Sequence, residues 1–289
     1  MKGISMPPIV MLVPLVLLVL LVIALCMTSC GDQQTELDSV PIQAEVAIAP
    51  LEVDSLAINA KKALLAYPAL TDANCEQFLL DWAKNRPYQR YELSTSMGEI
   101  GLETFSDAPL HSANFQYKVK RGYYMPSEFV RIVPEFVVQG GNSEDTRAQE
   151  MRWLIGKHTL PAEFRSNRLH FRGALAMGRT YKGNPNKRSA SYDFYLVVGR
   201  RVTRAELARV EREKGISYTE AQKERYVREG GTPHLDFEHT VFGQLVSGFE
   251  VLDLLAEVDT DASDWPLRRQ EFRLEAVVDV KSTRDDFVN

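Results

Sequence analysis

The N-terminal segment is an uncharged apolar run that decides where the rest of the chain folds. No charged side chain stands between Lys2 and Asp32, and the most apolar part, residues 9–25, is interrupted only by Pro14. The run is longer than the apolar core of an ordinary signal peptide and close to the length of a membrane-spanning helix. We therefore expect residues 1–30 to enter a membrane and the remainder to fold outside the cytoplasm.

The end of this run resembles a bacterial lipobox. Met27, Thr28 and Ser29 precede Cys30, with small residues directly before the cysteine and a polar stretch after it. Cleavage at this point would make Cys30 a lipidated N-terminus; the alternative is an uncleaved N-terminal anchor in which Cys30 is an incidental thiol. Both predict a protein of the bacterial cell envelope that is tethered to a membrane and faces the periplasm.

The charge and cysteine content exclude several classes of protein. A formal net charge of -5 gives no positive field to attract nucleic acid. Cys26 and Cys30 lie in the N-terminal run, so Cys75 alone is left, and one thiol can form neither a disulfide framework nor a cysteine-based zinc site. His234 and His239 also lack the spacing of a helical zinc site. We expect no metal and no cofactor.

The region between the membrane run and the main domain, residues 31–90, is expected to be a linker followed by a helical extension. Residues 31–54 are polar or mixed in character and have no helical period, which suits a tether. Apolar residues then recur at helical spacing in residues 74–85. Thr71 and Asp72 precede them, which predicts a helix capped at those two positions.

From Tyr91 onward the pattern changes to the alternation of β-strands. Residues 91–104 alternate around a Ser-Met-Gly turn, which predicts a hairpin at the start of the main domain, residues 91–289. Helices are expected at residues 112–121 and 250–257. Together these features predict a mostly antiparallel barrel or sandwich with capping helices. Further strands are expected at residues 128–133, 136–139, 173–177, 193–198, 241–246 and 271–280.

One segment, residues 200–230, does not fit an all-β pattern. Thr203 and Thr219 each open a capping box, and Gly215 between them is a helix stop. We therefore expect a helical hairpin inserted into the β domain. The nine basic residues between positions 200 and 228 could attract an anionic partner, but five interleaved glutamates favour a solvated helical face.

The tract FVRIVPEFVVQGG at residues 129–141 is too particular for a generic strand. Alternation places Phe129, Arg131 and Val133 on one inward face before Pro134 ends the run. On spacing alone, an ion pair at the end of a strand explains Arg131 at least as well as catalysis does.

This tract and four other motifs, in the same order, resemble the cyclophilin-type peptidyl-prolyl cis-trans isomerases. The resemblance extends over about residues 92–280. It implies a mainly β fold, an eight-stranded antiparallel β-barrel capped by two α-helices, here with the inserted hairpin and the N-terminal helical extension. The matching motifs are residues 95–100 with 108–124, residues 129–141, residues 161–164 with 173–177, residues 194–196 and residues 239–243.

The resemblance implies an enzyme that rotates X-Pro peptide bonds without a cofactor. Arg131 matches the catalytic arginine of the family, which donates a hydrogen bond to the prolyl nitrogen as the amide twists. Gln139 matches the glutamine that binds the substrate backbone, and Phe242 would lie behind the proline slot. The other implied substrate-binding residues are Phe136, Val137, Arg179, Asp193, Tyr195, His234, Leu235 and His239.

Several of these positions depart from the family pattern. Tyr195 replaces a phenylalanine and needs a partner for its hydroxyl. His234 replaces a tryptophan, and Asp193 replaces a glutamine, where it could pair with Arg131 or alter the preferred charge of the substrate. The expected clients are proline-containing unfolded or nascent envelope polypeptides, bound by a monomer. Two alternatives stay open: a catalytically weak peptide-binding chaperone of the same fold, and a lipoprotein whose helical hairpin docks a partner.

Overall fold

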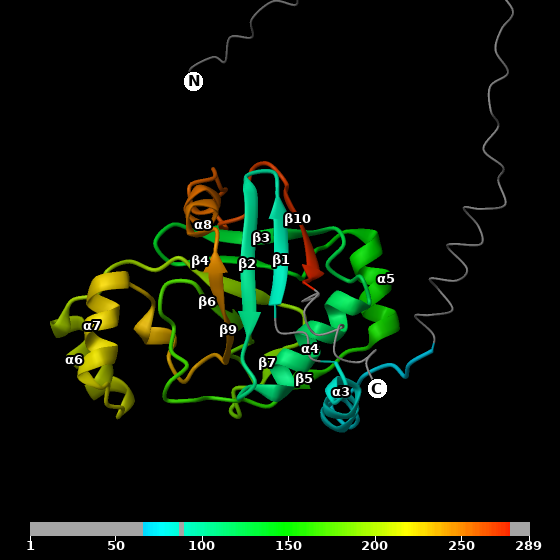
Figure 1. Ribbon diagram of the computed structural model, residues 1–289, viewed down its shortest axis with the longest axis horizontal. Helices are drawn as coiled ribbons and strands as arrows, with labels where there is room; N and C mark the ends of the chain where they lie inside the picture. The colour runs from blue at the N-terminus through cyan, green and yellow to red at the C-terminus, as the bar shows by residue number, and fades with distance from the viewer. Residues whose placement is uncertain (1–65, 87–89, 278–289) are drawn as a thin grey trace, which may run out of the picture. The chain divides into compact units, whose positions relative to one another are not determined.

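Eight strands close into a barrel in which every neighbouring pair is antiparallel (Figure 1). The computed structural model describes residues 66–86 and 90–277. Around the barrel the order is β1-β10-β3-β4-β8-β6-β9-β2, which confirms the predicted architecture. The strands are β1 (Arg90–Thr95), β2 (Gly98–Thr104), β3 (Ser127–Val133), β4 (Val137–Gly140), β6 (Ala174–Met177), β8 (Phe194–Val197), β9 (Val241–Ser247) and β10 (Gln270–Ala276).

The alternation that predicted these strands also determines which side chains fill the barrel interior. In β2, Ile100, Leu102 and Thr104 are buried, whereas the residues between them are partly or fully exposed. β6 and β8 break this alternation, because every residue of both strands is buried. Other parts of the chain therefore cover the outer face of the barrel at these two strands, and the predicted site residues gather there.

An irregularity in β3 changes the face on which Arg131 lies. The pairing of β3 with β4 shifts register between Phe129 and Arg131. Phe129 and Ile132 are buried, whereas the side chain of Arg131 keeps 39% of its surface exposed. The prediction that Arg131 shares an inward face with Phe129 is wrong, because a bulge moves one part of a strand out of phase with the other.

Two helices cover the barrel close to where they were predicted, α4 (Pro109–Lys120) and α8 (Phe249–Ala256). Phe115 of α4 packs into the barrel core. Its ring centroid lies 5.3 Å from that of Phe242 and 5.6 Å from that of Phe194. α8 packs against β2, β3 and β4.

The helical extension packs onto the barrel through α3 (Cys75–Ala83), which lies against α4. The rings of Trp82 and Tyr117 meet edge to face with centroids 5.1 Å apart. The predicted cap is wrong, because the carboxylate of Asp72 accepts hydrogen bonds from the N–H and hydroxyl of Thr159, at 2.6 and 2.9 Å, and not from the first turn of the helix.

A further helix, α5 (Thr146–Ile155), was not predicted. Asp145 caps it by accepting a hydrogen bond from the N–H of Ala148 at 2.7 Å. The helix is polar over most of its surface, so the apolar periodicity that marks an amphipathic helix is weak. A two-stranded sheet of β5 (Thr159–Leu160) and β7 (Ser189–Ala190) lies outside the barrel.

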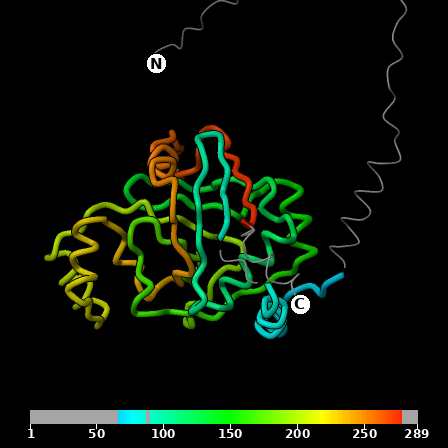
Figure 2. Tube along the Cα trace, in the orientation of Figure 1, coloured from blue at the N-terminus to red at the C-terminus, as the bar shows by residue number. Residues whose placement is uncertain are grey.

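The predicted hairpin consists of α6 (Arg204–Lys214) and α7 (Glu220–Glu229), followed by the short helix η1 (Pro233–Leu235) (Figures 1 and 2). Both capping boxes form, and Gly215 ends α6 at a φ of 64°. The hairpin has a small core that it shares with the segment before β6, so it is packed onto the barrel. This core contains Leu169, Phe171, Val202, Leu207, Val210, Tyr218 and Tyr226.

Two predictions fall outside the described residues: the membrane segment 1–30 with its lipidation site Cys30, and the tether 31–54. Among the residues that the structure does describe, no helix has the length and apolar character needed to cross a membrane. The same part of the chain holds no group of three or more side chains placed to bind a metal ion.

Candidate active site on the outer face of the barrel

Four neighbouring strands bring one row of residues to the same face. Arg131 in β3 lies opposite Gln139 in β4, which in turn lies opposite Tyr195 in β8. Tyr195 lies opposite Ala176 in β6. Directly opposed residues of antiparallel strands point to the same side of a sheet. The row therefore places a cation, an amide and an aromatic ring side by side.

An apolar cluster lies beside this row, and we call it the slot because it is the candidate site for a proline ring. Val137, Tyr195 and Leu235 are buried in one cluster, against which Phe136 packs. η1 supplies Leu235 and also stacks His234 on the ring of Phe136, with centroids 5.4 Å apart and planes 21° from parallel. The side chains of this cluster are aliphatic and aromatic, so they suit contact with an apolar ring. Phe242, which was expected behind the slot, is buried in the barrel core.

Asp264, in the loop between α8 and β10, orients Arg131. Nε and Nη2 of Arg131 donate to Oδ2 of Asp264, at 3.1 and 3.0 Å. The main-chain carbonyl of Asp264 also accepts a hydrogen bond from the N–H of Ile132 at 2.9 Å, which fastens this loop to β3. Cζ of Arg131 lies 5.6 Å from the centroid of the Phe136 ring. Nη1 takes part in neither bond to Asp264.

Asp193 does not form the ion pair with Arg131 that was one of its two expected roles, because Asp264 occupies that position. Burial raises the pKa of Asp193 to about 6, although the charge of Arg152 and a hydrogen bond from Asn142 act in the opposite direction. Asp193 therefore changes its charge in a range where a normal aspartate is fully ionised.

His239 is neutral, and both of its ring nitrogens are engaged. Burial lowers the pKa of His239 to about 4. Nδ1 donates to the carbonyl of Met177 at 3.2 Å, so Nε2 accepts from the hydroxyl of Tyr181 at 2.9 Å. Nη2 of Arg179 pairs with Glu238 at 2.6 Å, and its Cζ lies 4.0 Å from the ring centroid of Tyr181.

A buried network connects the slot to the inserted hairpin. The hydroxyl of Tyr195 is hydrogen-bonded to Nε2 of His170 at 3.0 Å, and Nδ1 of His170 to Oδ1 of Asp236 at 2.9 Å. Oδ2 of Asp236 accepts from the hydroxyls of Tyr218 and Tyr226, at 2.7 and 2.6 Å. The Tyr195 hydroxyl thus has the partner it requires, and one carboxylate ties the wall of the slot to the hairpin.

Comparison with known proteins identifies the family. Residues 90–275, more than half of the chain, match the family described as cyclophilin type peptidyl-prolyl cis-trans isomerase/CLD. The chain belongs to this family. Its enzyme class is therefore peptidyl-prolyl cis-trans isomerase, and the whole candidate site described above lies within the matched residues.

Bacterial proteins named as peptidyl-prolyl cis-trans isomerases are among the relatives of this chain. A Streptococcus pyogenes serotype M6 protein named "Putative bifunctional phosphatase/peptidyl-prolyl cis-trans isomerase" is 37% identical over 186 residues, which are 63% of this chain but only 37% of that protein. A Staphylococcus epidermidis protein named "Putative peptidyl-prolyl cis-trans isomerase" is 31% identical over 176 residues, which are 61% of this chain and 84% of that protein.

Among solved structures, a cyclophilin-type isomerase of Cryptosporidium parvum is similar to this chain. The match covers 66% of this chain and 98% of that protein, with 21% identity and a TM-score of 0.47.

The sequence did not predict Asp264 as part of this candidate site. It lies 133 positions from Arg131, in a polar turn that resembles many others. The local signal is weak: Asp261 accepts hydrogen bonds from the N–H groups of Ser263 and Trp265, and Asp264 has a φ of 63°. Such a turn can be read from the sequence, but the partner of its carboxylate cannot.

Proposed function

We propose that the protein catalyses rotation about X-Pro bonds by donating a hydrogen bond from Arg131 to the prolyl nitrogen. One arrangement carries this proposal: Arg131 lies opposite Gln139 beside an apolar slot, and a carboxylate orients its guanidinium. Gln139 would bind the substrate backbone, and the slot would hold the proline ring.

The chemistry requires little more than this. Amide resonance gives X-Pro rotation a barrier of about 20 kcal/mol, and the resonance is lost at the twisted transition state. The nitrogen then carries a lone pair that can accept a hydrogen bond. A guanidinium beside it interacts more strongly with the transition state than with the planar ground state, which is the condition for acceleration. His239, being neutral, adds no competing charge.

The first experiment measures cis-trans exchange of a short X-Pro peptide by NMR in the presence of the full chain in detergent. We expect the wild type to accelerate exchange and the Arg131→Ala variant to lose most of the acceleration while still binding peptide. Peptide binding without acceleration by either protein would refute catalysis and support the alternative, a peptide-holding chaperone. The observation that favours this alternative is the engagement of two Arg131 donors by Asp264.

We also propose that the enzyme is tethered in the bacterial cell envelope and acts, as a monomer, on proline-containing unfolded or nascent polypeptides there. The uncharged run of residues 3–31 and the lipobox-like end at Cys30 support this location. Metabolic labelling with an alkyne fatty acid should mark the wild type and leave Cys30→Ser unlabelled. Membrane-bound protein without label would indicate the uncleaved anchor, and recovery in the cytoplasm would overturn the location altogether.

A further inference from the structure

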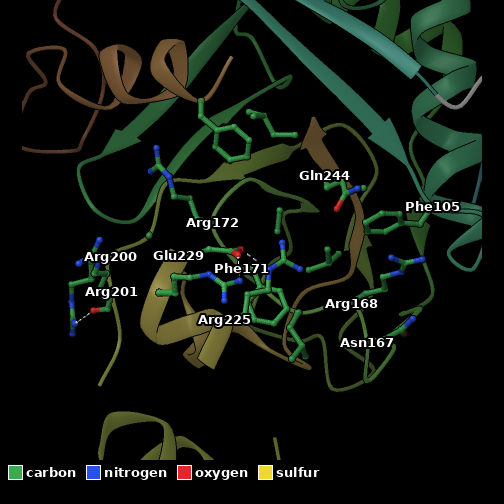
Figure 3. A pocket seen from close by; sticks show the side chains of 18 residues that line it. Phe105, Asn167, Arg168, Phe171, Arg172, Arg200, Arg201, Arg225, Glu229 and Gln244 are labelled. Carbon is green, nitrogen blue, oxygen red and sulfur yellow. Dashed lines mark hydrogen bonds and ion pairs between the residues drawn. The ribbon is translucent and has the colours of Figure 1, made fainter. Parts of the chain in front are cut away.

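A second hollow, of about 580 Å³, lies between the outer face of the barrel and the inserted hairpin (Figure 3). β6 and β9 contribute to its barrel side, and α7 contributes to its other side. We call it the arginine cavity, because six arginines line it against one carboxylate, that of Glu229. The arginines are Arg168, Arg172, Arg200, Arg201, Arg225 and Arg228.

Aromatic rings lie over three of these guanidinium groups, and the most distant is that of Arg172, with Cζ 5.8 Å from the centroid of the Phe249 ring. Cζ of Arg168 lies 3.6 Å from the centroid of the Phe105 ring, and Cζ of Arg225 lies 4.2 Å from that of Phe171. A guanidinium stacked on a ring keeps the N–H groups at its edges available for hydrogen bonds in its own plane. The cavity therefore combines oriented donors with aromatic surface.

The positive charge of the cavity is only partly neutralised. Six arginines and four carboxylates leave an excess of two positive charges. Among the described residues, Arg201 has no ion-pair partner, and Arg228, whose side chain is 69% exposed, shares Glu229 with Arg225. These two arginines are the ones most available to a ligand. The ion pairs are Arg168–Asp107, Arg172–Asp253, Arg200–Glu206, Arg225–Glu229 and Arg228–Glu229.

The arginine cavity and the proline slot share a wall. Ala174 and Val241 line the cavity and belong to the same apolar cluster as Tyr195 and Leu235 of the slot. Ala174 precedes Ala176 by two positions in β6, so both point to the same face of the barrel. A polypeptide bound in the slot can therefore continue along this face.

We propose that the arginine cavity is a second binding site for the polypeptide substrate and takes acidic side chains near the X-Pro bond. This inference rests on the proposed isomerase function. The excess charge selects carboxylates, which guanidinium groups bind through paired hydrogen bonds. The aromatic lining and the wall shared with the slot favour a peptide chain over an isolated small anion such as phosphate.

The test uses the full chain in detergent and three sets of peptides: a short X-Pro core, the core extended by about four Asp and Glu residues, and a twin extended by Asn and Gln. Extensions are made on either side of the core, and kcat and KM are measured by NMR exchange. For at least one side we expect the acidic peptide to have a KM about tenfold below that of its amide twin. High salt should reduce this difference, because exposed charges are screened.

Variants assign the effect to the cavity. Substituting both Arg201→Gln and Arg228→Gln should abolish the preference for the acidic peptide without altering turnover of the core. Arg212→Gln, the loss of one positive charge at an exposed position of α6 that does not line the cavity, is the control and should change neither the preference for the acidic peptide nor turnover of the core. Glu229→Gln should lower the KM of the acidic peptide about threefold, a gain that misfolding cannot produce.

The outcomes separate this inference from the function on which it rests. Equal KM values for acidic and amide peptides on both sides, with normal turnover of the core, would overturn the cavity proposal and leave the isomerase intact. Tight binding of the acidic peptide that depends on Arg201 and Arg228, without turnover of any peptide, would support the cavity and refute the isomerase. Binding of inorganic phosphate that depends on these arginines, with no preference for the acidic peptide, would make it a small-anion site and overturn the proposal.

Discussion

The slot and the arginine cavity adjoin the same apolar cluster of the barrel, yet they use arginine differently. The slot has one guanidinium, that of Arg131, oriented by Asp264. The cavity has six, of which Arg200, Arg201 and Arg228 are exposed and Arg200 is paired with Glu206. The activation barrier is lowered only by an interaction that is stronger in the transition state than in the ground state. For X-Pro rotation this requires a single hydrogen-bond donor placed at the prolyl nitrogen. Binding a polypeptide needs positive charge distributed over a surface, so each cavity arginine can shift its position more than the catalytic arginine can without loss of function.

The largest expected effect comes from exchanging arginine for lysine in both regions, which keeps the charge and removes the planar fork. Arg131→Lys should lower kcat on the short X-Pro peptide by about 10²–10³, because the three donors of an ammonium are on a single nitrogen and cannot reach Asp264 and the prolyl nitrogen from the separate positions that the guanidinium nitrogens occupy. Arg228→Lys should change KM for the acidic peptide by about twofold at most. Similar losses in both variants would show that the two regions do not differ as argued here.

The next largest effect concerns the buried hydrogen-bond network that connects the slot to the inserted hairpin. Asp236→Asn should lower the free energy of unfolding by about 3 kcal/mol, because a buried carboxylate that accepts from His170, Tyr218 and Tyr226 is replaced by a group that cannot satisfy them all. Denaturant unfolding of the full chain measures this loss. Tyr226→Phe removes a single hydroxyl and should cost about 1 kcal/mol.

The Asp236 variant also tests whether the network matters for catalysis. Tyr195 forms part of the slot and depends on His170, so disorder in the network should raise KM for the short peptide more than it lowers kcat. A loss of stability with unchanged KM would mean that the hairpin and the slot are joined structurally but act independently.

A smaller effect depends on pH and involves Asp193. Its folded-state pKa of about 6 lies above the value of an unfolded aspartate, so the folded protein binds a proton more tightly. Stability from this group is fully present below about pH 4 and is lost as the pH rises through 6. Asp193→Asn should therefore stabilise the protein by about 2 kcal/mol at pH 7 and by almost nothing at pH 4. Equal effects at the two pH values would show that Asp193 is not titrating in this range.

Much of the fold could be predicted because its signals are local. Alternation at Ile100, Leu102 and Thr104 marked β2, and the capping boxes at Thr203 and Thr219 marked the first turns of α6 and α7. α5 was missed because its surface is largely polar, which leaves a capping aspartate as the main sign of its start. Local patterns therefore predict elements whose burial follows one regular period.

The site was less predictable because its geometry depends on departures from such periods and on distant pairings. The register shift in β3 brings Arg131 to the outer face, whereas strict alternation predicts the inner one. Barrel closure then brings the α8–β10 loop beside β3, so that Asp264 meets Arg131. An arginine at position 131 indicated the site. The orientation of its side chain and its partner Asp264 depend on how the barrel closes, which local sequence patterns do not describe.

The smallest expected effect concerns that partner. Asp264→Asn keeps a side chain that tolerates the φ of 63° and removes the charge that orients Arg131. The main-chain bond from Ile132 to the carbonyl of residue 264 persists in this variant, so the loop stays against β3. We expect kcat on the short peptide to fall about fivefold, with little change in KM, because one strong charge-assisted contact is weakened. Ser263→Ala, at the exposed neighbouring position, should leave kcat unchanged.

The opposite result for Asp264→Asn would have a definite meaning. If kcat rises, the carboxylate restrains Arg131 in the resting site, and the slot resembles the arginine cavity in having a guanidinium that must leave its partner to bind a ligand. The distinction between the two regions would then lie in their apolar surroundings and not in the orientation of arginine. If kcat falls as expected, orientation by Asp264 is what makes a single arginine in the slot sufficient where the cavity uses several.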